Sequence, residues 1–192
     1  MKINLSKVVV LSAASFMVVG SAQAVTIFDE AVDTDLSGDL SAPTVLNLGL
    51  GENTISGSIG LSGGTGATDG TDADYFTFTI APGIELTSIT VDNYTGNDGG
   101  ISFLGFVADS SFGGQTGDDI DGSVLFGASS GEIISDLTGS TSLGAGDYSF
   151  WLQETADVTP GYSLTFTTVP EPSTSLLLGG ALCLLGVRRK RN

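Results

Sequence analysis

The stretch Asp74-Tyr75-Phe76-Thr77-Phe78-Thr79-Ile80 decides the fold of this chain. Phe76, Phe78 and Ile80 face one side, and the intervening tyrosine and threonines face the other. Strict alternation of this kind is typical of a β-strand with one buried face. Residues 147–154 and 161–168 repeat the alternation, so we expect three well-formed strands around which the rest of the body assembles.

Turns rich in Gly, Asp and Pro separate the other strand-like segments, which are residues 45–48, 53–60, 84–91 and 101–108, with short strands or turns at 123–126 and 133–137. The apolar parity of the 84–91 segment switches between Leu86 and Ile89, which predicts a bulge. The 101–108 segment is apolar on both faces, which predicts an interior strand. About eight or nine strands with frequent turns predict an all-β, antiparallel β-sandwich of the jelly-roll kind over residues 25–168. We see no helical period outside the two terminal segments.

The charges of the chain are strongly segregated. All six basic residues lie at the ends, at positions 2, 7 and 188–191, and the 22 acidic residues lie between them. A body without Lys, Arg or His excludes nucleic acid as a partner, because phosphate binding requires cationic neutralisation. It also argues against adsorption to anionic lipid. The acidic body either binds divalent cations or is simply kept soluble by repulsion.

Two groups of aspartates in Gly-rich loops are the candidate metal ligands: Asp69, Asp72 and Asp74 before and at the start of the best strand, and, less strongly, Asp118, Asp119 and Asp121. Clustered carboxylate oxygens on a turn suit calcium, which takes about 6–8 oxygen ligands. The alternative is that each group forms Asx turns and caps strand ends. Calcium is thus the only cofactor that the sequence indicates.

The stretch from Asp33 to Asp39 resembles the opening of a calcium-binding loop. A loop of the EF-hand kind needs a bidentate Glu at its twelfth position, and here that position is Thr44. Because the flanking helices are also missing, we interpret this stretch as a turn that leads into the first strands.

Enzymatic activity is not expected. The chain has no His, which excludes Ser–His and Cys–His nucleophiles and a His-ligated zinc. A glycosidase-like carboxylate pair remains open for Asp72 with Asp74, or Asp118 with Asp121.

The aromatic residues leave a binding role open. Tyr75, Tyr94 and Trp151 are candidates for an exposed sugar-stacking platform. The alternative for Trp151 is packing on the second face of a sandwich strand.

The N-terminal 24 residues have the three parts of a secretory signal peptide. Lys2 and Lys7 precede an apolar run, and Ala22-Gln23-Ala24 forms a small-x-small cleavage site. Signal peptidase would therefore leave Val25 as the first mature residue. The alternative is an uncleaved anchor helix, for which the apolar run is short.

The C-terminal segment, residues 169–192, begins with Val169-Pro170-Glu171-Pro172, continues with an apolar run and ends in the cluster Arg188, Arg189, Lys190 and Arg191. We expect a short transmembrane helix with its basic end in the cytoplasm. Residues 176–187 span about 18 Å as a helix, against a bilayer core of about 30 Å. A stretch this short suits transient insertion, with cleavage close to residues 170–173. The single cysteine, Cys183, lies in this run, so the chain has no intramolecular disulfide.

This order of Pro-Glu-Pro motif, apolar run and Arg cluster resembles the PEP-CTERM sorting signal of Gram-negative bacteria. The resemblance covers only about the last 24 residues. It implies processing by an exosortase, a membrane-embedded peptidase, in organisms that make extracellular polysaccharide or biofilm.

The motifs Asp72-Ala73-Asp74-Tyr75-Phe76, Gly146-Asp147-Tyr148-Ser149-Phe150 and Gly161-Tyr162-Ser163-Leu164 are similar to those of pre-peptidase C-terminal (PPC) domains. The resemblance implies a β-sandwich of that kind, and some members of the family bind calcium. These modules accompany secreted enzymes, but no catalytic domain accompanies the module in this chain.

The sequence therefore predicts an exported, exosortase-processed protein of the cell surface or extracellular matrix, associated with polysaccharide and without catalytic activity. Signal peptidase and an exosortase are its expected processing partners, and polysaccharide is a further candidate partner. A calcium-dependent carbohydrate-binding module and a secreted glycoside hydrolase are the alternatives.

Overall fold

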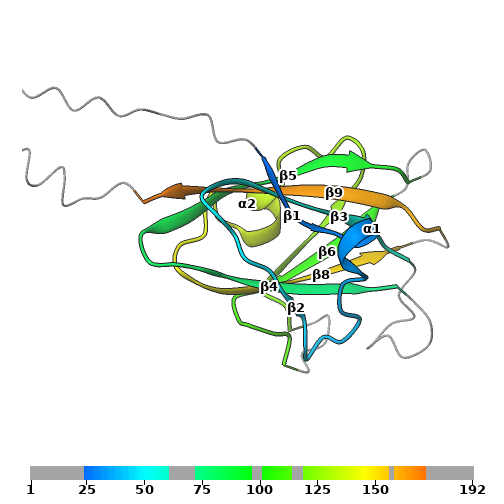
Figure 1. Ribbon diagram of the computed structural model, residues 1–192, viewed down its shortest axis with the longest axis horizontal. Coiled ribbons are helices and arrows are strands. Elements are labelled where there is room, and N and C mark those ends of the chain that lie inside the picture. Colours follow the sequence, from blue (N-terminus) through cyan, green and yellow to red (C-terminus); the bar gives the residue numbers. More distant parts are fainter. Residues whose placement is uncertain (1–23, 61–71, 97–100, 114–118, 156–157, 172–192) are drawn as a thin grey trace, which may run out of the picture.

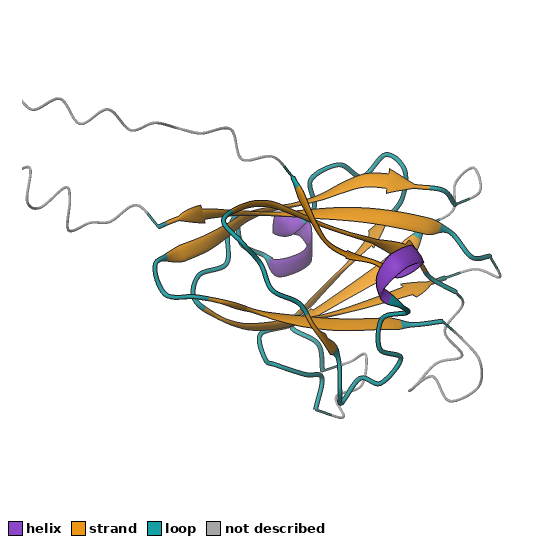
Figure 2. Cartoon of the chain, viewed as in Figure 1, coloured by secondary structure: helices purple, strands orange, loops and turns teal. Residues whose placement is uncertain are grey.

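The computed structural model describes residues 24–60, 72–96, 101–113, 119–155 and 158–171. They form two β-sheets packed face to face, with two short helices at the sides (Figures 1 and 2). The first sheet has the strand order β1 (Val25–Asp29), β3 (Gly51–Ser58), β9 (Gly161–Pro170) and β5 (Ile84–Tyr94). The second has the order β2 (Thr44–Val45), β4 (Asp74–Ile80), β8 (Gly146–Glu154), β6 (Ser102–Val107) and β7 (Gly122–Phe126). The β-rich fold is thus confirmed.

The two sheets meet in a core of aromatic rings. Phe166 of β9 contacts the rings of Phe76, Phe78 and Phe150 in the second sheet, with centroid distances of 5.9, 5.4 and 5.6 Å. All four side chains are almost completely buried. The prediction that β4, β8 and β9 are strands with one buried face is therefore confirmed, because each strand places one row of side chains between the sheets.

The expectation of purely antiparallel sheets is wrong. β1 pairs with β3, and β2 with β4, in parallel, at one edge of each sheet. Parallel neighbours need a long crossover connection, and residues 30–50 and 46–73 provide one in each case. The remaining strand pairs are antiparallel.

Two short helices were missed by the sequence prediction. α1 (Glu30–Asp33) follows β1 directly, and α2 (Ile134–Thr138) replaces the strand or turn expected at 133–137. Both are too short to show a 3.6-residue period over several turns. α2 buries Ile134 and Leu137 and ends at Gly139, whose φ of 68° suits a left-handed cap.

The bulge predicted in the 84–91 segment is confirmed, since the register of β5 against β9 shifts between Leu86 and Ser88 and again between Val91 and Asn93. The interior position predicted for the 101–108 segment is also confirmed, because β6 pairs with β8 on one side and β7 on the other.

The outer face of the second sheet carries a small core of its own. Tyr75 stacks on Trp151 at 5.7 Å, and Phe112 meets both rings edge-on. Tyr75 is buried here, and Tyr94 is buried between the sheets, so the idea of an exposed platform of Tyr75, Tyr94 and Trp151 is wrong. The reason is that residues 40 and 112, from two connections, cover this face.

Candidate functional site

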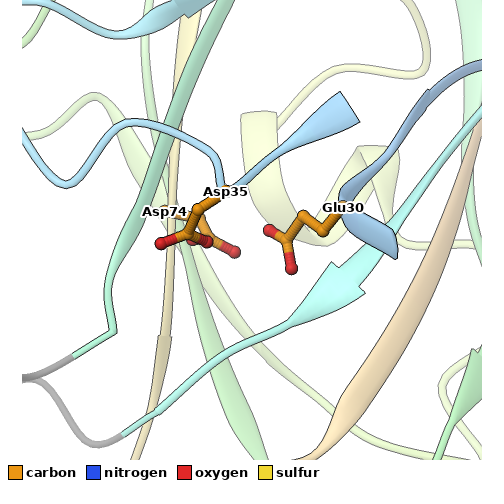
Figure 3. Close-up of side chains that lie close together, drawn as sticks. All are labelled: Glu30, Asp35 and Asp74. Atoms are coloured by element: carbon orange, nitrogen blue, oxygen red, sulfur yellow. The ribbon is translucent and has the colours of Figure 1, made fainter. Parts of the chain in front are cut away.

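Three carboxylates converge at one end of the sandwich (Figure 3). One oxygen each from Glu30, Asp35 and Asp74 lies within 4.8 Å of the other two. No basic side chain of the body is available to neutralise them, since Lys and Arg occur only at positions 2, 7 and 188–191. Three negative groups this close together repel one another unless protons or a cation intervene.

Short local structures bring these residues together. Asp74 is the first residue of β4, and Glu30 is the first residue of α1. The helix is started by Asp29, whose side chain accepts a hydrogen bond from the Ala31 N–H at 3.0 Å. Glu30 then lies across Gly57 of β3, where an added Cβ would come within 2.3 Å of the Glu30 carboxyl group. Only glycine leaves room for the carboxylate in this position.

Asp35 is placed by an unusual backbone conformation. Thr34, directly before it, has φ 93° and ψ 172°. This region of the map is almost restricted to glycine, and a β-branched residue there costs roughly 1–3 kcal/mol. The strained residue turns the chain out of α1 and directs Asp35 toward Asp74.

The cluster contains buried oxygens without hydrogen-bond partners. Asp74 is only 1% exposed, and although its Oδ2 accepts a hydrogen bond from the Tyr162 hydroxyl at 3.1 Å, its Oδ1 has none among the described residues. Glu30 repeats the pattern: Oε2 accepts from the Ser58 N–H at 2.7 Å, and Oε1 is unpaired within the same part of the chain. Buried polar atoms are normally satisfied, so two such oxygens at one place are candidates to bind water or a cation.

The electrostatics point the same way. Burial raises the pKa of Asp74 to about 9, with further increases from the charges of Glu30 and Asp72. Burial also raises the pKa of Glu30 and of Asp72, and the neighbouring charge of Asp35 adds to both shifts. The site therefore disfavours its own negative charge when it is alone and favours any cation that restores it.

The geometry fits calcium. Calcium binds oxygens at about 2.3–2.6 Å, so two ligands of one ion lie at most about 5 Å apart. The separation of 4.8 Å or less among the three carboxylate oxygens meets this limit. Three carboxylates offer up to six oxygens, and water commonly completes such a coordination shell.

The first predicted aspartate group is only partly brought together. Asp74 belongs to the cluster, and Asp72 lies near enough for its charge to raise the pKa of Asp74. Asp72 packs on Gly60, and its carbonyl accepts the Gly60 N–H at 2.8 Å. Asp69 lies outside the described residues.

The second predicted group does not form a comparable cluster among the described residues. Asp121 is exposed and accepts the Ala108 N–H at 2.7 Å, which holds the end of β6. Asp119 is exposed as well, and Asp118 lies outside the described part of the chain.

Sequence reasoning missed two of the three carboxylates. Glu30 carried no signal, because 44 positions separate it from Asp74 and only the tertiary fold joins them. Asp35 did carry one: the Asp-rich stretch 33–39 was noticed and then interpreted as a turn. In the structure the stretch is the end of α1 followed by irregular backbone with a bridge between Ser37 and Tyr75, and it brings the Asp35 carboxylate to the cluster.

The C-terminal candidate residues are divided between fold and tail. Val169 and Pro170 belong to β9, and the N–H of Glu171 donates to the Gly83 carbonyl at 2.9 Å. Ala24 is exposed just before β1. The other processing residues named from the sequence lie outside the described residues: Ala22, Pro172, Arg188, Arg189, Lys190 and Arg191. Within the described ranges no helix has the length and apolar character needed to cross a membrane, and both predicted terminal helices fall outside these ranges.

Comparison with known proteins gave one similar fold and one motif. No curated protein matches the chain. The 1.0 Å crystal structure of the pre-peptidase C-terminal domain of a collagenase from Bacillus anthracis is similar over 67% of this chain and 99% of that domain, with a TM-score of 0.34 and 14% identity.

The second finding concerns the C-terminal segment that the sequence singled out. Residues 168–191 match the family model of the PEP-CTERM protein-sorting motif. The chain therefore carries this sorting signal, which marks it as an exported protein targeted to an exosortase and destined for the cell surface or the extracellular space.

Proposed function

We propose that this protein is a non-catalytic component of the cell surface or extracellular matrix, and that its body is stabilised by a calcium ion held by Glu30, Asp35 and Asp74. The observation that carries the proposal is the pair of buried, unpartnered carboxylate oxygens on Glu30 and Asp74, facing a third carboxylate. The sorting motif directs the chain out of the cell, where calcium is available to fill such a site.

Calcium would act here as a structural tie. Glu30 and Asp35 come from the segment after β1, and Asp74 begins β4 of the opposite sheet. One ion bound to all three joins the N-terminal segment and the first sheet to the second sheet. Binding to the folded state alone stabilises it by about 4 kcal/mol when free calcium exceeds the dissociation constant about 1,000-fold.

The test is differential scanning calorimetry of the mature protein in excess calcium and in chelator. We expect a large rise in melting temperature with calcium, abolished by Asp74→Asn. Asp136→Asn is the matched control, because it removes the same charge from an exposed position on α2. Equal melting temperatures of the wild type in calcium and in chelator would refute the metal site.

The processing part of the proposal has a separate test. Mass spectrometry of the mature surface protein should find a chain that starts at Val25 and ends close to residues 170–173. Recovery of surface protein that still ends in the intact basic cluster would refute exosortase processing.

A calcium-dependent carbohydrate-binding role is a second candidate, favoured by one observation. A depression of about 450 Å³ adjoins Glu30 and is lined by polar groups that include Ser56, Ser58 and Asn93. Its volume is in the range of small-molecule sites, and its hydroxyl and amide groups suit a neutral sugar. Saturable binding on a glycan array in calcium, lost in chelator and weakened by Asn93→Ala, would favour this role over a purely structural matrix protein.

A further inference from the structure

The sorting motif does not begin after the folded body but inside it. The motif match starts at residue 168, while β9 continues to Pro170. Thr168 is still a fully integrated strand residue, paired with Gly51 of β3 and Leu86 of β5. Its hydroxyl also donates to the Gly49 carbonyl at 2.6 Å. Residues 168–170 therefore belong both to strand β9 and to the sorting motif.

The next three residues are attached on one side only. Val169 pairs with Glu85, and Pro170 pairs with Ile84, both in β5, whereas β3 has no partner beyond Gly51. The Glu171 N–H donates to the Gly83 carbonyl at 2.9 Å. The start of the Pro-Glu-Pro motif is thus held in the sheet by its pairing with β5 alone.

Proline is compatible with this arrangement for a geometric reason. Successive N–H groups of a strand point to opposite sides, and that of Glu171 points to β5. The nitrogen of Pro170 therefore points to the other side, where β3 has ended, so the missing donor removes no ladder hydrogen bond. The start of the motif can therefore continue β9 although Pro170 has no N–H to donate.

A peptidase requires access to the backbone on both sides of the bond that it cuts. Backbone groups engaged in a sheet are not accessible in this way, so cleavage then depends on the population of a locally opened state. Release of residues 169–171 from β5 would leave the pairing of β9 with β3 intact, because that pairing ends at Thr168. The opening is therefore small and local.

We propose that the folded body gates its own processing: the end of β9 must detach from β5 before the motif can enter the exosortase. This inference rests on the proposed processing of the chain and adds its regulation. Removal of the tail is slow while residues 169–171 are paired with β5, and it becomes faster when these residues are released from β5.

A disulfide lock tests the gate. Glu85 and Val169 are direct cross-strand partners, and the Cα atoms of such pairs lie about 4.5–5.5 Å apart, within the range of Cα separations that disulfides span. Glu85→Cys with Val169→Cys would be made in a Cys183→Ala background and exported in cells that contain the exosortase. Cys183→Ala alone is the control, and tail loss is followed by mass spectrometry.

We expect the oxidised lock to lower the rate of tail removal at least tenfold, and added reductant to restore the control rate. Reductant breaks only the disulfide and leaves the two substitutions in place, so a variant that is slow because the substitutions themselves misfold it would not recover. A locked variant processed as fast as the control would overturn the gate. A control chain that is never trimmed would instead overturn the proposed processing itself, which separates the two failures.

Hydrogen exchange of the purified full-length chain provides an independent measurement. The amides of Val169 and Glu171 should exchange more slowly than in an unstructured peptide of the same sequence, and faster than the amide of Phe166 in the middle of β9. Exchange of Glu171 at the rate of the free peptide would contradict the fastened strand end.

Discussion

Two buried carboxylates lie at the same end of the second sheet, and the protein treats them in opposite ways. Asp74 begins β4 and Glu154 ends the neighbouring β8, and each side chain is only 1% exposed. Glu154 accepts hydrogen bonds from the hydroxyls of Tyr94 and Ser102, at 3.0 and 2.6 Å, and from the Thr155 N–H at 2.8 Å. Among the described residues, Asp74 accepts a hydrogen bond from the Tyr162 hydroxyl alone, and it faces other carboxylates.

The difference shows how to distinguish a structural acid from a ligand. Both residues carry a carboxyl group and both are buried to the same extent, so burial alone is not diagnostic. The hydrogen-bond partners differ, because Glu154 accepts from two hydroxyls and a backbone N–H, whereas Asp74 accepts from one hydroxyl among the described residues, which is why we propose Asp74 as a ligand. Substitutions at the two positions should therefore have opposite signs in the absence of calcium.

The largest effect is expected at Glu154. Glu154→Gln removes the charge that two buried hydroxyls share, and hydrogen bonds to charged groups contribute about 1.5–3 kcal/mol each. We expect a loss of about 3 kcal/mol in the free energy of unfolding, equal in calcium and in chelator, measured by urea denaturation. Glu52→Gln, at an exposed position of β3, is the control. A loss that appeared only in calcium would place Glu154 in the metal site and erase the contrast.

The pH dependence should give a smaller effect at Asp74. An unfolded aspartate loses its proton near pH 4, whereas Asp74 in the folded, calcium-free body has a pKa of about 9 because of burial and of Glu30 and Asp72. Between these values the unfolded state binds fewer protons, so stability falls as pH rises. Asp35 and the Tyr162 hydroxyl also face this group.

In chelator we therefore expect the unfolding free energy to be about 2 kcal/mol lower at pH 7 than at pH 5.5, since each pH unit between the two pKa values corresponds to about 1.4 kcal/mol. Asp74→Asn should flatten this slope, and saturating calcium should remove it in the wild type. A slope of the same size in Asp74→Asn would assign the effect to the general repulsion of the acidic body.

The smallest effect concerns the space that Glu30 needs. Gly57→Ala would place a methyl group on the Glu30 carboxylate and displace it. We expect about a tenfold weaker calcium affinity by isothermal titration calorimetry, equivalent to about 1.4 kcal/mol. Ser58→Ala, which keeps the N–H that Glu30 uses, should bind like the wild type. Unchanged affinity in Gly57→Ala would exclude Glu30 as a ligand.

The sequence predicted those features that local patterns determine. Alternation located β4, β8 and β9, and the parity switch located the bulge in β5. The parallel edge pairs were not predictable in this way, because pairing depends on where long connections carry β1 and β2. The helices α1 and α2 span one turn or little more, which is too short for a periodic signal.

The same distinction between local patterns and tertiary contacts applies to the residues of the candidate site. Asp74 was selected because it belongs to a group of aspartates before and at the start of a clear strand. Glu30 was not, because its role depends on Gly57, a residue of a different strand that gives it space. Tyr75 was expected to be exposed because alternation shows only that a side chain faces outward, and not that residues from another connection cover it.

The directions of β1 and β9 give the body a polarity. β1 runs toward the carboxylate cluster, which begins at Glu30 directly after its end, and β9 runs away from the cluster, since Tyr162 lies at its start. Both described ends of the chain therefore point away from the cluster (Figure 1). In a precursor anchored to the membrane through its C-terminal segment, the cluster would lie at the end of the body farthest from the membrane. Calcium could then bind the cluster before the tail is removed.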